Sequence, residues 1–268
     1  MKAVPNRVQQ LFLRCRDEKR AAFIPYICAG DPSLGQTVKL ASALETAGAD
    51  LLELGVPFSD PLADGIVNQM AAQRALQAGA SVPGVLDCVR QIRAHSQIAI
   101  VLYTYLNPIF QYGFAKFHRD AEAAGVDGLL ILDLPPDEIG EAHDTSLLHI
   151  SLIAPTTSRD RIATICARAE GFIYYVSREG VTGARTSLAD SIGARVAEIR
   201  EHTDLPIAVG FGISTPEQAR DVARTGDAVV VGSAIVREIE RHGAEDDLAA
   251  RIGDFVKPMA DAVTAPRT

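Results

Sequence analysis

The sequence has no tryptophan, few cysteines and no long hydrophobic stretch. The absence of tryptophan excludes nothing, but the four cysteines form no CxxC pair and are too few to crosslink a chain of 268 residues. No apolar run approaches the roughly 18 residues that span a bilayer, and the charged segment 1–20 lacks the apolar core of a signal peptide. We therefore expect a cytoplasmic protein that is neither exported nor inserted into a membrane.

Several catalytic signatures are also missing. The six histidines form no HExxH motif or paired-ligand spacing, and neither a GxSxG elbow nor a Walker A motif occurs. Lys39 and Lys116 fall in helical stretches rather than in strands. The sequence thus gives no indication of a metal site, a serine triad, nucleotide hydrolysis or a Schiff-base lysine.

The charge balance narrows the possible partners. There are 34 acidic and 26 basic residues, which gives a net charge of -8. Such a chain repels nucleic acid and anionic lipid unless a local basic patch reverses the charge. Because 47% of the residues are hydrophobic, the chain has ample material for a globular core, and disordered and fibrous classes are excluded.

Short runs of β-branched and aliphatic residues recur along the chain, each followed by a longer stretch with helical periodicity. These eight strand candidates lie at 23–28, 51–54, 98–103, 128–132, 150–154, 172–176, 207–211 and 228–231. Most lack polar alternation, as expected of parallel strands covered on both faces, and the connections are long enough for crossover helices. The pattern predicts a parallel α/β sheet.

A weak internal repeat supports this prediction. Segments 47–52, 124–129 and 225–229 each place a glycine just before a strand, where it caps the preceding helix. The eight units of a strand followed by a helical stretch match the size of a (β/α)8 barrel, whereas a doubly wound sheet would carry a glycine-rich fingerprint after its first strand. We expect one (β/α)8 TIM-barrel domain over 1–268, with a short N-terminal helical extension and with 1–20 and 258–268 as peripheral additions.

Polar residues at the carboxyl ends of barrel strands are candidates for catalysis, and Glu53 ends the second strand. A buried carboxyl group there has a raised pKa suited to acid–base chemistry. The alternative is a glutamate held by a structural lysine or arginine. The loop that follows resembles a lid, and Asp60 and Asp64 could bring a second carboxylate over Glu53 or could simply shape turns.

The last two strands point to a phosphate. Glycine clusters at 210–214 and 232–236 close strands seven and eight, where backbone N–H groups and helix N-termini bind anions in these barrels. Plain turns are the alternative. The polar loop 177–187 is suited to folding over a bound phosphate or is a mobile solvent loop.

The segment 52–65, with the sequence LELGVPFSDPLADG, resembles the signature of the tryptophan synthase alpha chain family. Further segments that are similar follow in order over nearly the whole chain: 23–26, 29–32, 125–128, 133–136, 177–185, 210–214 and 231–236. The resemblance implies a barrel that cleaves indole-3-glycerol phosphate to indole and glyceraldehyde 3-phosphate without a cofactor of its own.

The resemblance also implies roles for individual residues. Glu53 would protonate the indole ring carbon C3 and help to deprotonate the glycerol hydroxyl, and Asp64 would stabilise the positive intermediate at the ring N–H. Thr182 would close loop six onto loop two. The other implied substrate-binding residues are Gly183, Gly212, Gly232 and Ser233 for the phosphate, with Phe211 beside it, and Phe23, Tyr105 and Tyr174 for the indole and glycerol.

The family works with a beta chain that binds pyridoxal phosphate, in an alpha2-beta2 complex that passes indole between the subunits. Pro57, Asp60, Asn107 and Pro135 match positions near that interface. This sequence differs from the family's pattern at Ile66, Tyr103 and Leu106, which affects loop two and the shape of the indole pocket.

Three other interpretations remain open. Another phosphate-binding barrel of amino-acid biosynthesis would share strands seven and eight but not segment 53–64. A stand-alone indole-3-glycerol phosphate lyase would carry nearly the same motifs. A catalytically silent barrel could serve only as an allosteric binding subunit.

Overall fold

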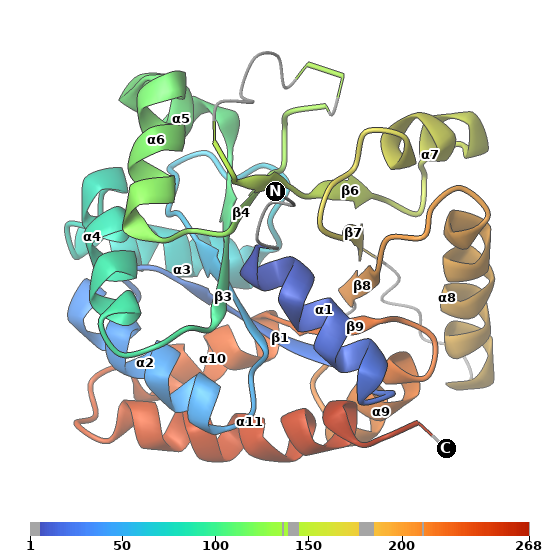
Figure 1. Ribbon diagram of the computed structural model, residues 1–268. Helices are drawn as coiled ribbons and strands as arrows, with labels where there is room; N and C mark the ends of the chain where they lie inside the picture. Colours follow the sequence, from blue (N-terminus) through green and yellow to red (C-terminus); the bar gives the residue numbers. More distant parts are fainter. Residues whose placement is uncertain (1–5, 136, 139–144, 177–184, 211, 268) are drawn as a thin grey trace.

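The computed structural model describes residues 6–135, 137–138, 145–176, 185–210 and 212–267, with the side chains of 185–191 excepted. All paired strands run parallel in one sheet, in the order β5-β4-β3-β2-β1-β9-β8-β7-β6. The strands are β1 (Ala22–Cys28), β2 (Leu51–Gly55), β3 (Ala99–Thr104), β4 (Gly128–Ile131), β5 (Leu148–His149), β6 (Ser151–Ile153), β7 (Ile173–Val176), β8 (Ile207–Gly210) and β9 (Ala228–Val231). Because β5 and β6, the two ends of this order, are separated only by Ile150, the sheet curls into a barrel (Figure 1).

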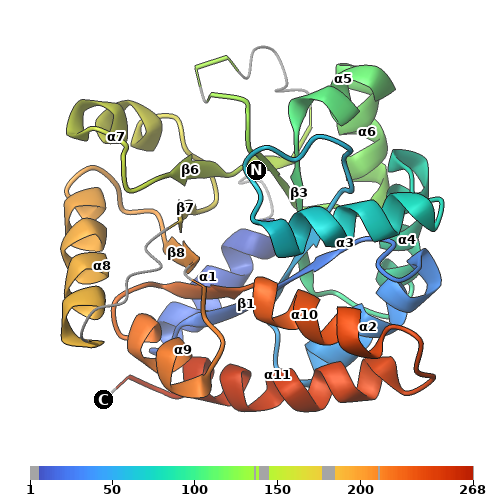
Figure 2. The ribbon, with the colours of Figure 1, turned by 180° about the vertical axis from the view of Figure 1, so that it is seen from behind.

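Helices surround this barrel, as Figures 1 and 2 show from opposite sides. They are α1 (Arg7–Asp17), α2 (Leu34–Thr46), α3 (Ile66–Gln77), α4 (Val82–Arg93), α5 (Leu106–Tyr112), α6 (Phe114–Ala124), α7 (Arg159–Cys166), α8 (Arg185–Arg200), α9 (Pro216–Ala223), α10 (Ser233–His242) and α11 (Leu248–Thr264). The predicted (β/α)8 barrel class is confirmed. The fifth predicted strand differs in detail, because it begins at Leu148 and is interrupted at Ile150, whose N–H donates to Leu129 of β4.

Local sequence explains where several helices begin and end. The side chains of Ser33, Ser81 and Thr215 accept hydrogen bonds from the first-turn N–H groups of α2, α4 and α9, which would otherwise have no partner in the helix. Gly125 ends α6 with a φ of 96°, a left-handed conformation that glycine adopts without a steric penalty.

Alternation along the strands decides which side chains point into the barrel. On β1, Phe23 and Ile27 pack in the cluster between sheet and helices, whereas Ile24 belongs to the cluster inside the barrel. Tyr26 has the same parity as Ile24 and lies in register with Glu53 of β2. The barrel interior near its carboxyl end is therefore lined from these two positions.

Helix α1 and the last turns of α11 are integral to the core, which corrects, for the described residues, the expectation that 1–20 and 258–268 are peripheral. Helix α1 buries Val8, Leu11, Phe12 and Cys15 in the cluster inside the barrel, and it lies across the near end of the barrel in Figure 1. Helix α11 packs against α2 and α9 and buries residues on both sides of its internal Pro258.

The glycine repeat marks three equivalent aspartates at the amino end of the barrel. Asp50, Asp127 and Asp227 precede β2, β4 and β9, and each carboxylate accepts an N–H group near the start of the adjacent strand. The donors are Phe23 of β1 (3.0 Å), Ile100 of β3 (2.8 Å) and Ile207 of β8 (2.9 Å). Each also pairs with an arginine: Arg20 at 2.7 Å, Arg93 at 2.8 Å and Arg200 at 2.9 Å, respectively. This arrangement ties adjacent strands together at the end away from the predicted site.

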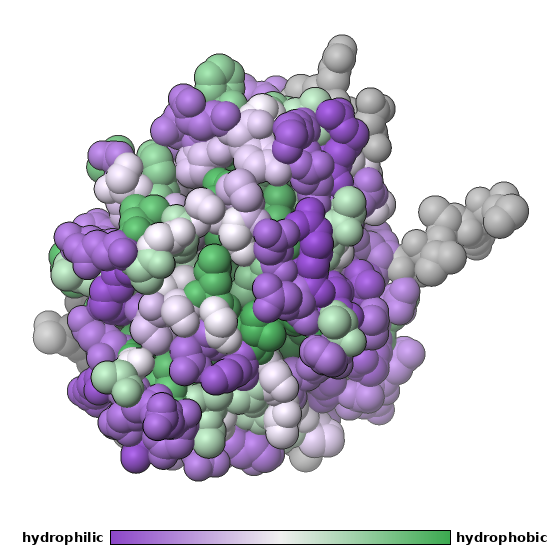
Figure 3. Space-filling view, turned by 90° about the vertical axis from the view of Figure 1, so that its left-hand side faces the viewer, coloured by the Kyte–Doolittle hydropathy of each residue, from purple (hydrophilic) through white to green (hydrophobic). Residues whose placement is uncertain are grey.

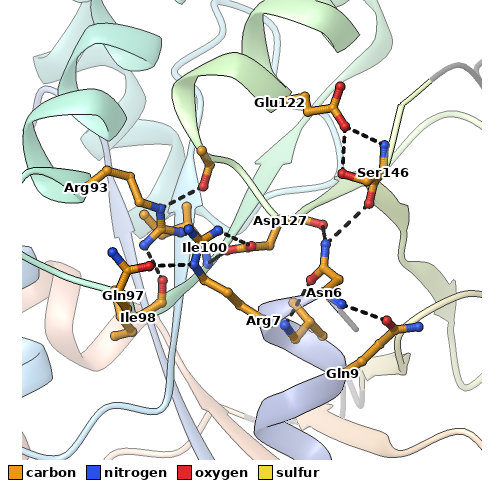
Figure 4. Close-up of polar contacts among 12 residues, drawn as sticks. Asn6, Arg7, Gln9, Arg93, Gln97, Ile98, Ile100, Glu122, Asp127 and Ser146 are labelled. Atoms are coloured by element: carbon orange, nitrogen blue, oxygen red, sulfur yellow. Dashed lines mark hydrogen bonds and ion pairs between the residues drawn. The ribbon is translucent and has the colours of Figure 1, made fainter. Parts of the chain in front are cut away.

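Figure 4 shows the contacts of Asp127. Besides Arg93 it pairs with Arg7 of α1 at 2.9 Å, and its backbone carbonyl accepts from the Asn6 side chain. Helix α1 is thus fixed to the barrel by ionic contacts as well as by apolar packing.

The outer surface is mixed in character. On the side shown in Figure 3, hydrophilic residues predominate around the margins and paler and hydrophobic residues gather between them. Within the described part of the chain, no helix combines the length and apolarity needed to cross a membrane.

Candidate active site

A cavity of about 350 Å³ opens at the carboxyl ends of the strands. This is the end at which (β/α)8 barrels place their active sites, and the volume falls within the usual range for small-molecule sites. Its walls come from β1, β2, β3, β7, β8, β9 and from the loop that precedes α3. The lining residues used below are Tyr26, Glu53, Asp64, Tyr103, Tyr174, Gly212, Gly232, Ser233 and Arg237.

Glu53 lies at the centre of the barrel wall and is 2% exposed. Burial raises its pKa to about 8, and the nearby charge of Asp64 acts in the same direction. The Tyr174 hydroxyl donates to Oε2 at 3.4 Å and partly offsets the shift. The carboxyl group is therefore mostly protonated at neutral pH. Among the described residues no lysine or arginine forms an ion pair with it, so the alternative of a structural pair has no support.

Asp64 comes from the loop after β2 and is 8% exposed. Its two carboxylate oxygens accept hydrogen bonds from two tyrosine hydroxyls, Oδ1 from Tyr103 and Oδ2 from Tyr105, both at 2.8 Å. The Tyr105 hydroxyl also accepts the N–H of Ala63 at 3.0 Å, which fastens the loop. Of the two loop aspartates considered from the sequence, Asp64 reaches the cavity, whereas Asp60 is exposed and accepts from the Ser59 hydroxyl.

Aromatic side chains form much of the wall, and here one expectation is corrected. Phe23 is 0% exposed and packs outside the barrel, so it does not line the cavity. Tyr26, three residues further along β1, lines it instead. A Cβ at Gly55 would lie 2.5 Å from the Tyr26 hydroxyl, so this glycine at the end of β2 makes room for the ring. Tyr174 lines the cavity as predicted.

Gly212, Gly232 and Ser233 line the side of the cavity beneath α9 and α10. The structure records no side-chain cap at the N-terminus of α10, where Gly232 is the N-cap residue. Among the described residues, a Cβ at Gly212 would meet nothing within 4 Å, so no described atom fills the space in front of its backbone. Thr182, Gly183 and Phe211, predicted for the same region, lie outside the described residues.

Arg237 is a lining residue that the sequence analysis missed. It lies four residues after Ser233, about one turn along α10, and residues at this spacing share a face of a helix. The signal that could have found it is the spacing of four residues from Ser233.

The residues expected at a partner interface are distributed unevenly over the surface. Asp60 and Asn107 are exposed and Pro135 is half-buried, whereas Pro57 is buried beneath the surface. Two large apolar side chains, Leu62 and Phe110, are 91% and 69% exposed. They follow neighbouring strands β2 and β3, so an apolar surface accompanies the polar residues on this rim.

Three larger clefts, of about 800, 830 and 590 Å³, lie at the amino end of the barrel. Arg7, Arg20 and Arg200, which line them, are engaged with Asp127, Asp50 and Asp227, respectively, as described above. The smaller cavity at the other end is the better candidate, because it contains the perturbed carboxyl group. In the described ranges, no three histidine, cysteine, aspartate or glutamate side chains are grouped as metal ligands.

A parallel barrel with a buried acid and a second carboxylate at the carboxyl ends of its strands belongs to the class of (β/α)8-barrel enzymes. Within that class, the family described as "Tryptophan synthase alpha chain" matches residues 12–264 of this chain. The chain belongs to the tryptophan synthase alpha chain family.

Individual relatives agree over nearly their whole length. The tryptophan synthase alpha chain of Opitutus terrae is 50% identical, covering 94% of this chain and 98% of that protein. The alpha chain of Neisseria gonorrhoeae is 47% identical, covering 96% and 99%. A crystal structure of tryptophan synthase subunit alpha from Legionella pneumophila superimposes with a TM-score of 0.89 at 38% identity, covering 97% and 99%.

Proposed function

We propose that the cavity binds indole-3-glycerol phosphate and that Glu53 and Asp64 catalyse its cleavage to indole and glyceraldehyde 3-phosphate. The chain's family is a family of lyases in tryptophan biosynthesis, in which it has the role of the alpha subunit. The observation that carries the residue assignment is the pairing of a buried, protonated Glu53 with a hydrogen-bonded Asp64 in one cavity.

Glu53 supplies the acid. Its carboxyl proton is transferred to indole carbon C3, which converts the ring to a cationic indolenine. The resulting carboxylate then takes the proton of the adjacent glycerol hydroxyl, while the bond from C3 to the side chain breaks and its electron pair returns to the ring. Glu53 donates one proton and accepts another, so a single carboxyl group serves both steps.

Asp64 stabilises the positive charge that develops at the ring nitrogen. An ionised carboxylate held beside the indole N–H in a nearly water-free site interacts strongly with that charge. Its two tyrosine partners support the ionised form, because hydrogen bonds to a carboxylate favour it over the neutral acid.

The phosphate lies at the other end of the cavity. Backbone N–H groups of Gly212, Gly232 and Ser233 and the N-terminus of α10 favour an anion there. Arg237 adds a full positive charge within the same wall. From the resemblance, we add Gly183 and Phe211 to this phosphate site. We likewise assign to Thr182 the closure of loop six onto loop two.

The chain acts with a tryptophan synthase beta chain, which carries the pyridoxal phosphate and receives indole in an alpha2-beta2 complex in the cytoplasm. The exposed rim with Asp60, Leu62, Asn107 and Phe110, and with half-buried Pro135, supports docking at the open end of the barrel. Pro57 would shape this rim from below rather than contact the partner.

Glu53→Gln tests the assignment most simply. The variant should keep its fold and its affinity for 3-(indol-3-yl)propyl phosphate, an uncleavable analogue, and should lose roughly 10²-fold or more in turnover because the amide cannot donate the proton. Turnover close to that of the unmodified chain would refute the role of Glu53.

A further inference from the structure

Tyr103 is the third tyrosine in contact with the catalytic carboxylates. It points into the barrel near the end of β3, in register with Gly55 of β2, and lines the cavity. Its hydroxyl donates to Oδ1 of Asp64 at 2.8 Å, and its ring packs edge-on against that of Tyr26 at 5.2 Å. The side chain is therefore held both at its ring and at its hydroxyl.

We propose that Tyr103 is a positioning residue, whose hydroxyl orients the Asp64 carboxylate to receive the indole N–H. This inference rests on the proposed function. Tyr105 has a different part, because its hydroxyl also accepts from Ala63 N–H and so anchors the loop itself. The bond from Tyr103 holds Oδ1, the other oxygen of the carboxylate, from the barrel wall.

The two hydroxyls act together because they come from positions two residues apart at the end of the same strand, which face the same side. Because Tyr103 and Tyr105 each hold one carboxylate oxygen, rotation of the carboxylate about its terminal bond would break both hydrogen bonds. The two hydroxyls use two of the roughly four acceptor sites of a carboxylate. The two tyrosines thus preorganise Asp64 for the indole N–H.

The role of the Tyr103 hydroxyl can be tested separately from that of its ring. Tyr103→Phe keeps the ring against Tyr26 and removes only the donor to Asp64. Tyr112→Phe is the matched control, because Tyr112 of α5 also donates to an aspartate, Asp120 of α6 at 2.6 Å, and neither residue lines the cavity.

The experiment measures cleavage of indole-3-glycerol phosphate by the full chain and by both variants. Loss of a hydrogen bond to a charged group should lower kcat/KM about tenfold in Tyr103→Phe. Tyr112→Phe should leave kcat/KM unchanged.

A pair of uncleavable ligands isolates the path through Asp64. Affinity for 3-(indol-3-yl)propyl phosphate should fall in Tyr103→Phe, whereas affinity for its N-methyl derivative, which has no N–H to donate, should be unchanged. Equal losses for both ligands, or a kcat/KM like that of the unmodified chain, would overturn the proposal and leave Tyr103 as a cavity wall. If the unmodified chain does not cleave the substrate at all, the proposed function fails, and the ligand pair still decides the role of Tyr103.

Discussion

The hydroxyl of Tyr174 lies 3.4 Å from Oε2 of Glu53, although the two residues are 121 positions apart in the chain. Tyr174 comes from β7 and Glu53 from β2, which are not neighbours in the sheet. The contact therefore crosses the barrel interior, and it places a polar donor on an acid that burial otherwise keeps protonated.

This relationship predicts an alkaline limb in the pH profile. Burial raises the pKa of Glu53 to about 8, so kcat/KM for cleavage should fall as the pH rises through about 8 and the acid loses its proton. In Tyr174→Phe the donor that favours the ionised form is gone, and the limb should move to higher pH. A limb that stays in place or moves to lower pH in this variant would contradict the account of Glu53.

A second prediction concerns the phosphate. Because the space beside Gly212 is open, Gly212→Val should fold normally and should raise KM at least about tenfold by intruding where backbone N–H groups meet the anion. Arg237→Ala should weaken binding of 3-(indol-3-yl)propyl phosphate but not of the unphosphorylated alcohol. Gly35→Val, at another open glycine on α2, is the control. Unchanged phosphate affinity in both site variants would place the anion elsewhere.

A third prediction addresses stability at the amino end of the barrel. Asp127→Ala leaves Arg7, Arg93 and the Ile100 N–H without their shared acceptor, which should lower the free energy of unfolding by about 3 kcal/mol. Urea denaturation measures the change. Asp221→Ala, which removes an exposed ion pair with Arg224, should cost less than about 0.5 kcal/mol. Similar losses in both variants would mean that Asp127 has no special part in joining the strands.

The fourth prediction concerns docking of a beta chain. Phe110 is 69% exposed beside the open end of the barrel, and Phe110→Asp should weaken binding of a tryptophan synthase beta chain at least about tenfold by burying a charge at the interface. Leu13→Asp, an equally drastic change on α1 at the opposite end, should leave the affinity unchanged. Titration calorimetry compares the two, and the reverse order of effects would place the interface at the amino end.

The sequence predicted the barrel because strands buried on both faces are continuous hydrophobic runs, and these are visible without an alignment. The same feature explains the error at Phe23. A strand without polar alternation does not reveal which parity faces inward, and only the register with Glu53 selects Tyr26 over Phe23. Glu53 was predictable because a carboxylate inside such a run is conspicuous.

Other features depend on tertiary structure alone. The hydroxyl of Tyr103 reaches Asp64 only because the loop after β2 folds back over β3, a contact that no local pattern in the sequence records. The burial of α1 and of 258–264 was likewise missed, since an amphipathic terminal helix shows an apolar face but not what that face covers.

The most direct test of the central claim is indole release from indole-3-glycerol phosphate by the purified chain, measured alone and with a tryptophan synthase beta chain. The account predicts feeble release alone, a marked rise on addition of the beta chain, and loss of both in Glu53→Gln. High activity alone with no response to the beta chain would indicate a free lyase. No release in either case would contradict the catalytic role proposed for this cavity.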